Sequence, residues 1–396
     1  MEATNATAVF IPTDDGSLPC KPEELRQLLA ERRQFELDQY YDHIQPHTFD
    51  TRFVAFSLEE AKAWREYNRG AAELSKEEEG LLAGLKARLE EAIQVFVERG
   101  NAAFVRLSTR SPKDAVDKDE EALRPLLVEA LLQQQQRSRK ASLDELDAND
   151  CLIALRKAFF QRMRVTSADQ VFQLMMYSNR TVSDMKRAID HADKIEWNLG
   201  LIVREFVAID IEGELRAFVH NKQLNALSQY FADCYFAGLH EHKDEVQERV
   251  LQFFEQVKED IPFDSYNIDF AVSKDRVYIL ELKYGCALSL SCSLARSLSL
   301  SLLPFLRFNL LVSKSPFSES TGGALFDWKK DRNVLEEGPF EFRTVPEENA
   351  CKNLMQPWKG LVDRAIHHHL HSTEENVLVD EPKRNNNHPD SRCVLQ

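Results

Sequence analysis

Two acidic side chains on adjoining predicted strands are the first candidates for chemistry. Asp269 and Glu281 fall in residues 266–272 and 276–282, two apolar runs joined by a polar turn at 273–275. Because side chains alternate along a strand, both carboxylates can face one side, and a residue two positions beyond Glu281 returns to that side. Two carboxylates and an amide oxygen suit Mg²⁺ that bridges nucleotide phosphates. Two solvated carboxylates on a hairpin fit the same spacing.

Four basic side chains offer the complementary charge. Arg106, Arg204 and Arg216 lie in predicted strands, and Lys113 lies in the loop 109–114. Guanidinium and ammonium groups suit polyphosphate oxygens, although each of these residues alone also fits an ordinary surface charge. The sequence contains neither GxxxxGK[ST] nor GxGxxG, which excludes a P-loop and a Rossmann phosphate site.

Mixed strands and helices must position these groups. Hydrophobic periodicity predicts strands at 102–108, 199–207, 215–219, 224–230, 266–272 and 276–282. Helices are predicted at 57–64, 75–99, 150–164, 169–176 and 243–258, the first two opened by capping boxes at Ser57 and Ser75. This order indicates an α+β protein, not strict βαβ units. The charged stretch 117–140, with its run of Gln at 133–136, predicts a solvent-exposed helix in an insertion.

Length and composition narrow the class of protein. The chain has 396 residues, and its 50 Lys and Arg against 65 Asp and Glu give a net charge of −15. That length suggests two domains or one two-lobed domain. The acidic balance argues against broad binding to nucleic acid or anionic membranes. Seven Cys without a CxxC pair fit a reducing compartment, and no signal-peptide pattern opens the chain, so a cytoplasmic location is expected.

One stretch differs from the rest of the chain. Residues 282–318 contain no Asp or Glu, and Ser alternates with Leu at 288–291 and 297–302. A transmembrane helix and a two-faced strand are two interpretations, although the Ser residues interrupt the apolar run that a membrane span needs. We favour a third, an in-frame retained intron at 283–315, because a CT repeat translates as alternating Ser and Leu. Joining the codons of Lys283 and Ser315 would give Asn.

Five segments taken in order resemble the cell division cycle protein 123 family. The resemblance covers roughly residues 39–345, with 117–150 and 283–315 as departures. The segments are 104–115, 201–206, 214–219, 227–230 and 269–282, the last continuing at 316–317 and 321–328.

The resemblance implies a fold and a function. The fold is an ATP-grasp-like, two-lobed α+β fold with antiparallel sheets flanked by helices, which binds ATP and Mg²⁺. The family is an assembly chaperone of eukaryotic translation initiation factor 2 that binds its gamma subunit, and it is linked to cell-cycle progression. An ATP-grasp carboxylate–amine ligase and a nucleotide-dead interaction module remain alternatives. The chain then divides into a leader and helix at 1–38, an N-terminal lobe segment at 39–108, a loop and helical region at 109–197, a C-terminal lobe at 198–345 and an extension with a disordered tail at 346–396.

The family's site residues carry over by position. Those expected near the phosphates are Arg106, Ser111, Lys113 and Arg216. Those expected along the adenine are Arg204, Glu205, Phe206 and Val207. Asp269, Glu281 and the family's Asn would hold Mg²⁺, but this chain has Lys283 at the Asn position, and an ammonium repels a metal ion. Arg106 and Glu281 also depart from the family, which often has Lys and Asp there.

The C-terminal region contains two weaker motifs. The histidines at 367–369 and 371 could bind a transition metal, and Cys393–Gln396 fits a prenylation motif. The polar tail from about residue 373 is predicted to be disordered. Neither a nucleic-acid partner nor a membrane is expected.

Overall fold

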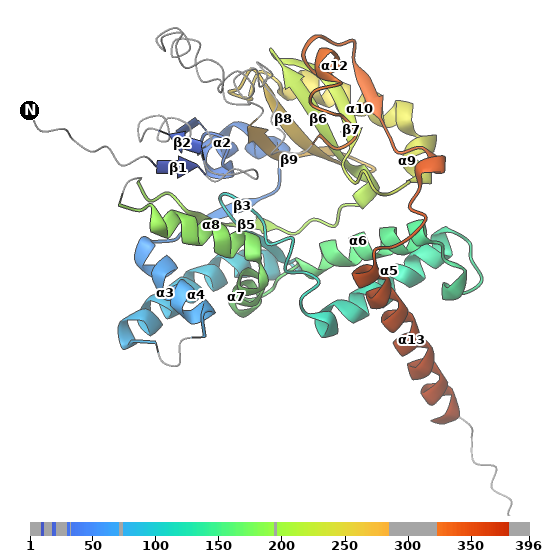
Figure 1. Cartoon of the computed structure of the whole chain (residues 1–396), viewed down its shortest axis with the longest axis horizontal. Coiled ribbons are helices and arrows are strands. Elements are labelled where there is room, and N and C mark those ends of the chain that lie inside the picture. Colours follow the sequence, from blue (N-terminus) through green and yellow to red (C-terminus); the bar gives the residue numbers. More distant parts are fainter. Residues whose placement is uncertain are drawn as a thin grey trace, which may run out of the picture.

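The computed structural model describes residues 9–11, 18–20, 30–31, 33–70, 74–193, 196–284 and 323–379. It contains three packed parts, which we call the N lobe, the C lobe and the helical unit (Figure 1). Most of the segment 283–315 and the motif at Cys393 lie outside the described residues. A short antiparallel ribbon, β1 (Val9–Ile11) and β2 (Leu18–Cys20), precedes the lobes.

The N lobe is a three-stranded antiparallel sheet covered by four helices. The strands, in the order β3-β5-β4, are β3 (Thr51–Ala55), β5 (Gly200–Glu205) and β4 (Ala103–Leu107). The helices are α3 (Leu58–Asn68), α4 (Lys76–Val97), α7 (Ala168–Tyr177) and α8 (Asn179–Asp190). Both predicted capping boxes form, at Ser57 and Ser75. Gly100, with a φ of +77°, follows the end of α4 as the sequence predicts.

The C lobe is a five-stranded sheet in the order β10-β7-β6-β8-β9, in which only the β10–β7 pair is parallel among the described strands. The predicted hairpins 215–230 and 266–282 are confirmed. The strands are β6 (Glu214–His220), β7 (Gln223–Gln229), β8 (Tyr266–Val272), β9 (Val277–Tyr284) and β10 (Glu341–Arg343). The accompanying helices are α2 (Leu37–Ile44), α9 (Ala237–Glu241), α10 (Lys243–Val257) and α12 (Arg332–Glu337).

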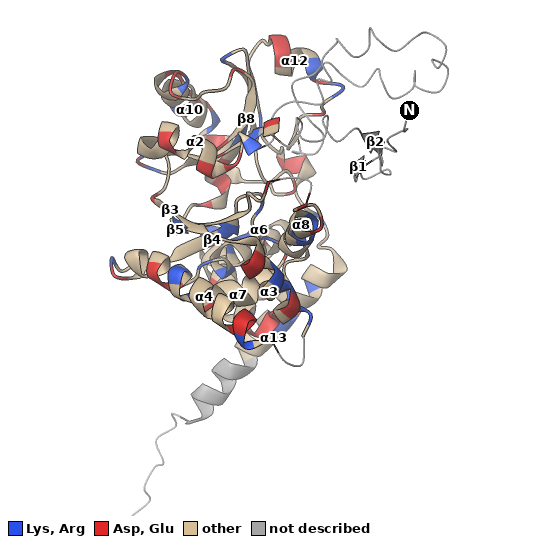
Figure 2. Cartoon of the chain, turned by 90° about the vertical axis from the view of Figure 1, so that its left-hand side faces the viewer, with Lys and Arg blue, Asp and Glu red and all other residues tan. Residues whose placement is uncertain are grey.

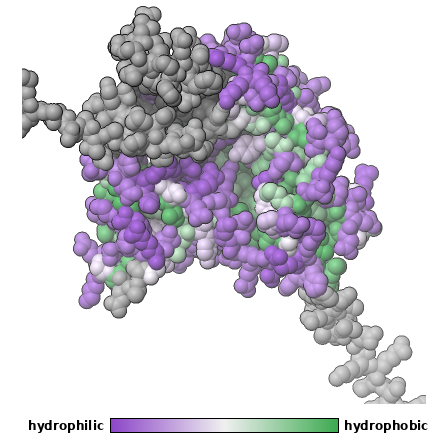
Figure 3. All heavy atoms as spheres, viewed as in Figure 1, coloured by the Kyte–Doolittle hydropathy of each residue, from purple (hydrophilic) through white to green (hydrophobic). Residues whose placement is uncertain are grey.

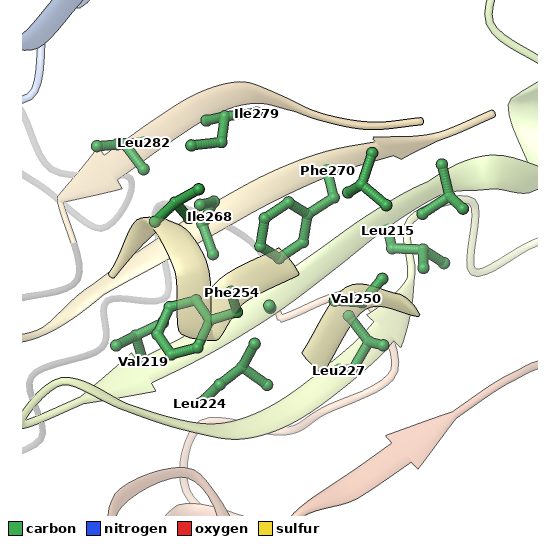
Figure 4. Packing of buried hydrophobic residues seen from close by; sticks show 14 of the residues in the cluster. Leu215, Val219, Leu224, Leu227, Val250, Phe254, Ile268, Phe270, Ile279 and Leu282 are labelled. Carbon is green, nitrogen blue, oxygen red and sulfur yellow. The ribbon is translucent and has the colours of Figure 1, made fainter. Parts of the chain in front are cut away.

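One face of the C-lobe sheet makes the largest apolar core, and the other face carries polar groups together with a smaller apolar cluster around Phe218 and Phe326. Leu215, Ile268 and Ile279 pack against Val250 and Phe254 of α10 (Figure 4). Because side chains alternate, the neighbours of these residues along the strands point to the opposite face. A bulge in β9, where the pairing shifts between Asp269 and Phe270 of β8, keeps this alternation in register with the core.

The helical unit corrects one expectation from the sequence. It consists of α5 (Glu120–Arg137), α6 (Ala148–Arg162) and α13 (Gln356–Val379). The helix predicted within 117–140 is confirmed, but its expected exposure to solvent is wrong, because Leu123, Leu127 and Leu131 are buried in a shared core. Leu361 and Val362 of α13 complete that core from the far end of the chain. The helix α13 also continues to residue 379, beyond the point where the polar composition predicts disorder.

Charged residues of both signs are spread over both lobes. Figure 2 shows Lys and Arg interspersed with Asp and Glu among other residues. The face drawn in Figure 3 is mainly hydrophilic where residues are described, with apolar residues visible between the polar ones. Among the described residues, no helix combines the length and the apolar run that crossing a bilayer requires.

The two lobes meet at β9, the edge strand of the C-lobe sheet. The buried guanidinium of Arg204 donates from Nη1 to the carbonyl of Leu280 at 2.8 Å and from Nη2 to Thr48 Oγ1 at 2.6 Å. The Thr48 hydroxyl donates in turn to the carbonyl of Ile279 at 2.6 Å. The amide of Leu282 donates to Tyr40 Oη at 2.9 Å. Backbone groups that an edge strand would otherwise leave unpaired thus bond to Arg204 of the N lobe, to Thr48 and to Tyr40 of α2.

We expect Arg204→Ala to destabilise the protein by about 3 kcal/mol, because it removes two buried hydrogen bonds and leaves the Leu280 carbonyl without its charged donor. Urea unfolding followed by circular dichroism measures the change. The matched control is Arg69→Ala, since the Arg69 side chain is exposed and pairs with Glu66 one helical turn away. That control should change stability by less than about 0.5 kcal/mol. Equal effects of the two variants would contradict a stabilising role for Arg204.

Candidate functional site

The two carboxylates identified from the sequence face each other across neighbouring strands. Asp269 of β8 pairs in register with Glu281 of β9, on the sheet face opposite the apolar core. Leu280 is the extra residue of the bulge, so Glu281 and Lys283 return to the same face while Leu282 points into the core. The predicted return to this face two residues beyond Glu281 is therefore confirmed.

The side chain at that return position is the ammonium of Lys283. Lys283 Nζ lies 3.0 Å from Asp269 Oδ2 and 3.6 Å from Glu281 Oε2. Its side chain is 22% exposed, whereas that of Asp269 is only 3% exposed. A cation carried by the protein thus lies between the two carboxylates.

Two arginines also bind these carboxylates, one to each. Arg216 of β6 donates to Asp269 from Nε at 2.8 Å and from Nη2 at 2.9 Å, a bidentate pair that is almost fully buried. Arg106 of β4 reaches across from the N lobe and donates to Glu281 Oε1 at 3.2 Å. Alternation explains why it can, because Val105 and Leu107 belong to the N-lobe core and Arg106 therefore points toward the C lobe.

The cations keep both carboxylates ionised. Burial alone would raise the pKa of Glu281, but the charges of Lys283, Arg106 and Lys113 outweigh it and lower that pKa well below its ordinary value. Burial likewise opposes ionisation of Asp269, and Arg216 and Lys283 reverse this and lower its pKa. Asp269 and Glu281 are therefore negative at neutral pH.

A third group of residues surrounds Tyr230, which follows β7. Lys113 Nζ donates to Tyr230 Oη at 3.4 Å and lies 5.1 Å from the centre of its ring. The guanidinium carbon of Arg216 lies 4.9 Å from that centre, and Lys283 Nζ lies 5.9 Å from it. Tyr230, followed by the carboxylates of Glu214 and Glu281, raises the pKa of Lys113. Three cations around one ring mark Tyr230 as the centre of the site.

Motif reasoning did not identify Tyr230 or Glu214 as site residues. Tyr230 belongs to a segment used only for the family resemblance, and Glu214 opens β6. Burial raises the pKa of Glu214, partly offset by Lys113. Strand alternation could have identified Glu214, because it lies two residues before Arg216 and therefore shares its face of the strand.

The expected adenine residues are placed at the end of β5, where Arg204 bonds to Leu280, the residue before Glu281. The guanidinium of Arg204 is used at the lobe junction, and burial lowers its pKa to about 10, which leaves it protonated at neutral pH. Glu205 donates its amide to the Asp50 carbonyl at 2.8 Å and accepts a bond from Asn101 at 2.9 Å. The buried ring of Phe206 contacts Phe160, with ring centres 5.1 Å apart.

The other two predicted residues occupy loops. Val207 lies two residues after the end of β5, in the connection toward β6. Ser111 is buried in the loop after β4, two residues before Lys113. The structure therefore brings together Arg106, Lys113, Arg216, Asp269 and Glu281, and gives Arg204 a role in joining the lobes.

The residues present do not fit a divalent metal ion. Mg²⁺ needs carboxylate oxygens free at about 2.1 Å, yet both carboxylates contact the Lys283 ammonium. No group of three or more His, Cys, Asp or Glu able to hold a metal occurs within the part of the chain that the structure describes, which includes the histidines at 367–369.

Comparison with known proteins places these observations in a family. The model of the D123 family matches residues 158–359 of the chain. No curated protein matches it by sequence.

Solved structures give weaker likenesses. Cdc123 from Schizosaccharomyces pombe is 16% identical, with 80% of this chain and 98% of that chain covered and a TM-score of 0.49. Its C-terminally truncated form is 17% identical, with the same coverage and TM-score. A RimK domain ATP-grasp protein from Sphaerobacter thermophilus is 12% identical over 25% of this chain and 34% of its own, with a TM-score of 0.17.

We expect the free energy of unfolding to decrease as the pH is lowered through the acid range, because Asp269 and Glu281 have pKa values below their ordinary ones. Their ionised forms stabilise the fold above the unfolded-state pKa, near 4.5 for Glu281, and that contribution is lost as the pH falls below it. Glu281→Gln should reduce the loss between pH 6 and pH 3 by about 1 to 2 kcal/mol. Urea titrations at each pH measure this, with Glu248→Gln on the exposed face of α10 as control. An unchanged pH slope in Glu281→Gln would contradict it.

Proposed function

We propose that this chain, which belongs to the D123 family, is a nucleotide-binding assembly factor that works by binding and not by turnover. Its nucleotide is ATP, and its partner is the gamma subunit of eukaryotic translation initiation factor 2 in the cytoplasm. The family resemblance supports the partner. The arrangement of charges where the lobes meet supports the nucleotide.

The observation that carries the proposal is the cluster of cations at the lobe junction. Four of them, Arg106, Lys113, Arg216 and Lys283, lie around Asp269, Glu281 and Tyr230. Even with Glu214 counted as a third carboxylate beside Asp269 and Glu281, the four cations leave an excess of positive charge here. A polyphosphate is the ligand that several guanidinium and ammonium groups on separate elements bind best.

The residues divide the work between the lobes. Arg106 and Lys113 would bind phosphate oxygens from the N-lobe side, and Arg216 from the C-lobe sheet, with Ser111 in the same loop as Lys113. The predicted adenine contact by residues 204–207 would have to use groups other than the amides of Glu205 and Phe206, which already donate to the carbonyls of Asp50 and Ala102. A ligand held this way contacts both lobes and would stabilise their relative position, which is how nucleotide binding would favour docking of a partner.

We expect Mg²⁺ to be bound only by a different, spliced form of the chain. In a spliced form with Asn in place of Lys283, Asp269, Glu281 and that Asn would supply three oxygen ligands for Mg²⁺.

A second candidate function, a nucleotide-free interaction module, is favoured by one observation. Asp269 is already fully paired by Arg216 and Lys283, so the cluster is satisfied without a ligand.

We expect Lys113→Ala to weaken ATP binding about tenfold, or about 1.4 kcal/mol, since it removes an exposed ammonium that makes no buried ion pair. Isothermal titration calorimetry measures the affinity. Lys118→Ala, an exposed lysine in the same loop, serves as control and should bind as the unmodified protein does. ATP affinity equal in the two variants would exclude a phosphate contact by Lys113.

We expect purified gamma subunit to bind the full chain more tightly with ATP than without it, by at least about threefold. The reason is that ATP ordering the two lobes leaves less to be ordered when the partner binds. Biolayer interferometry with immobilised gamma subunit measures both affinities, and Lys113→Ala should lose the ATP effect while keeping the basal affinity. No binding in either condition would rule out this partner.

A further inference from the structure

We propose that the ammonium of Lys283 replaces the divalent metal ion, so that this chain binds a nucleoside triphosphate free of metal. The inference rests on the proposed nucleotide-binding function and specifies the form of the ligand. Its basis is the position of Lys283 Nζ, 3.0 Å from one carboxylate and 3.6 Å from the other.

The backbone of β9 fixes that position. Lys283 pairs in register with Asn267 of β8, two residues from the Glu281–Asp269 pair, and the bulge at Leu280 lies before both pairs. The lysine stem therefore leaves the sheet on the same face as the two carboxylates. Its side chain remains 22% exposed, so the ammonium can contact an incoming anion while it holds Asp269.

A metal ion cannot share the site with this ammonium. Asp269 uses both oxygens for Arg216, and its Oδ2 also accepts Lys283. Glu281 divides its two oxygens between Arg106 and Lys283. A divalent ion would have to displace Lys283 and would then face its charge at short distance in a partly buried site, where repulsion is weakly screened.

The balance of charge determines which ligand form is preferred. In a metal-dependent nucleotide site, the carboxylates bind a metal ion, and that ion neutralises the phosphates. Here the carboxylates are already neutralised by arginines and Lys283, and the surplus of the cluster is positive. The uncomplexed triphosphate carries more negative charge than its magnesium complex, so the cluster should bind the uncomplexed form more tightly.

The first experiment compares ATP affinity in EDTA and in excess Mg²⁺ by isothermal titration calorimetry. The unmodified chain should bind ATP at least about threefold more tightly in EDTA than in Mg²⁺. The Lys283→Asn variant should show the opposite preference and bind ATP about tenfold more tightly in Mg²⁺ than in EDTA. Lys283→Met, which offers neither charge nor oxygen, should bind weakly in both. Lys274→Asn in the exposed β8–β9 turn is the matched control and should behave as the unmodified chain. Tighter binding by the unmodified chain in Mg²⁺ would overturn the inference.

The second experiment needs no nucleotide. Mn²⁺ alone is titrated and followed by electron paramagnetic resonance of the free ion. The unmodified chain should bind no Mn²⁺ at this site, whereas the Lys283→Asn variant should bind one ion. The double variant Lys283→Asn, Asp269→Asn should lose that ion again. A bound ion in the unmodified chain that Asp269→Asn removes would overturn the inference. If ATP binds in neither buffer, the proposed nucleotide function fails, and the Mn²⁺ result still decides whether Lys283 excludes the metal.

Discussion

The structure depends on how the N lobe binds the backbone of one edge strand. Consecutive carbonyls of β9, at Ile279 and Leu280, accept hydrogen bonds from Thr48 and from the buried guanidinium of Arg204. A sheet edge buried without partners would be costly, so these bonds hold the lobes in one arrangement. The docking also completes the charged site, whose other members lie on strands of the C lobe. Arg106 meets Glu281 only because the N-lobe sheet is held against β9.

Much of this architecture was readable in the sequence, and the reason is local. The β8–β9 hairpin, the facing of Asp269 and Glu281 and the capping boxes of α3 and α4 all depend on residues a few positions apart. Alternation within a strand also predicted that position 283 returns to the carboxylate face. These features are decided by backbone periodicity and short-range hydrogen bonds, which a single sequence displays directly.

What the sequence did not reveal depends on contacts between distant segments. Arg204 has the same residue type as the phosphate-binding candidates, and only the approach of Leu280 and Thr48 shows that its guanidinium joins the lobes. Tyr230 matters because Lys113, Arg216 and Lys283 come from three separate elements to surround it. The charged surface of α5 concealed its buried leucines, since their partner helix α13 lies more than two hundred residues further along the chain.

That long separation also sets an order of events during synthesis. The helices α5 and α6 leave the ribosome together and bury Leu127, Leu131 and Leu155 against each other, but Leu361, Val362 and Ala365 arrive only with α13. At about 5 to 20 residues per second, roughly 10 to 40 s pass before the third helix can cover its share of that surface. For that interval a nascent chain presents an unfinished apolar face to its surroundings. The helical unit therefore reaches its final packing long after its first helix, which begins within the first third of the chain, has been made.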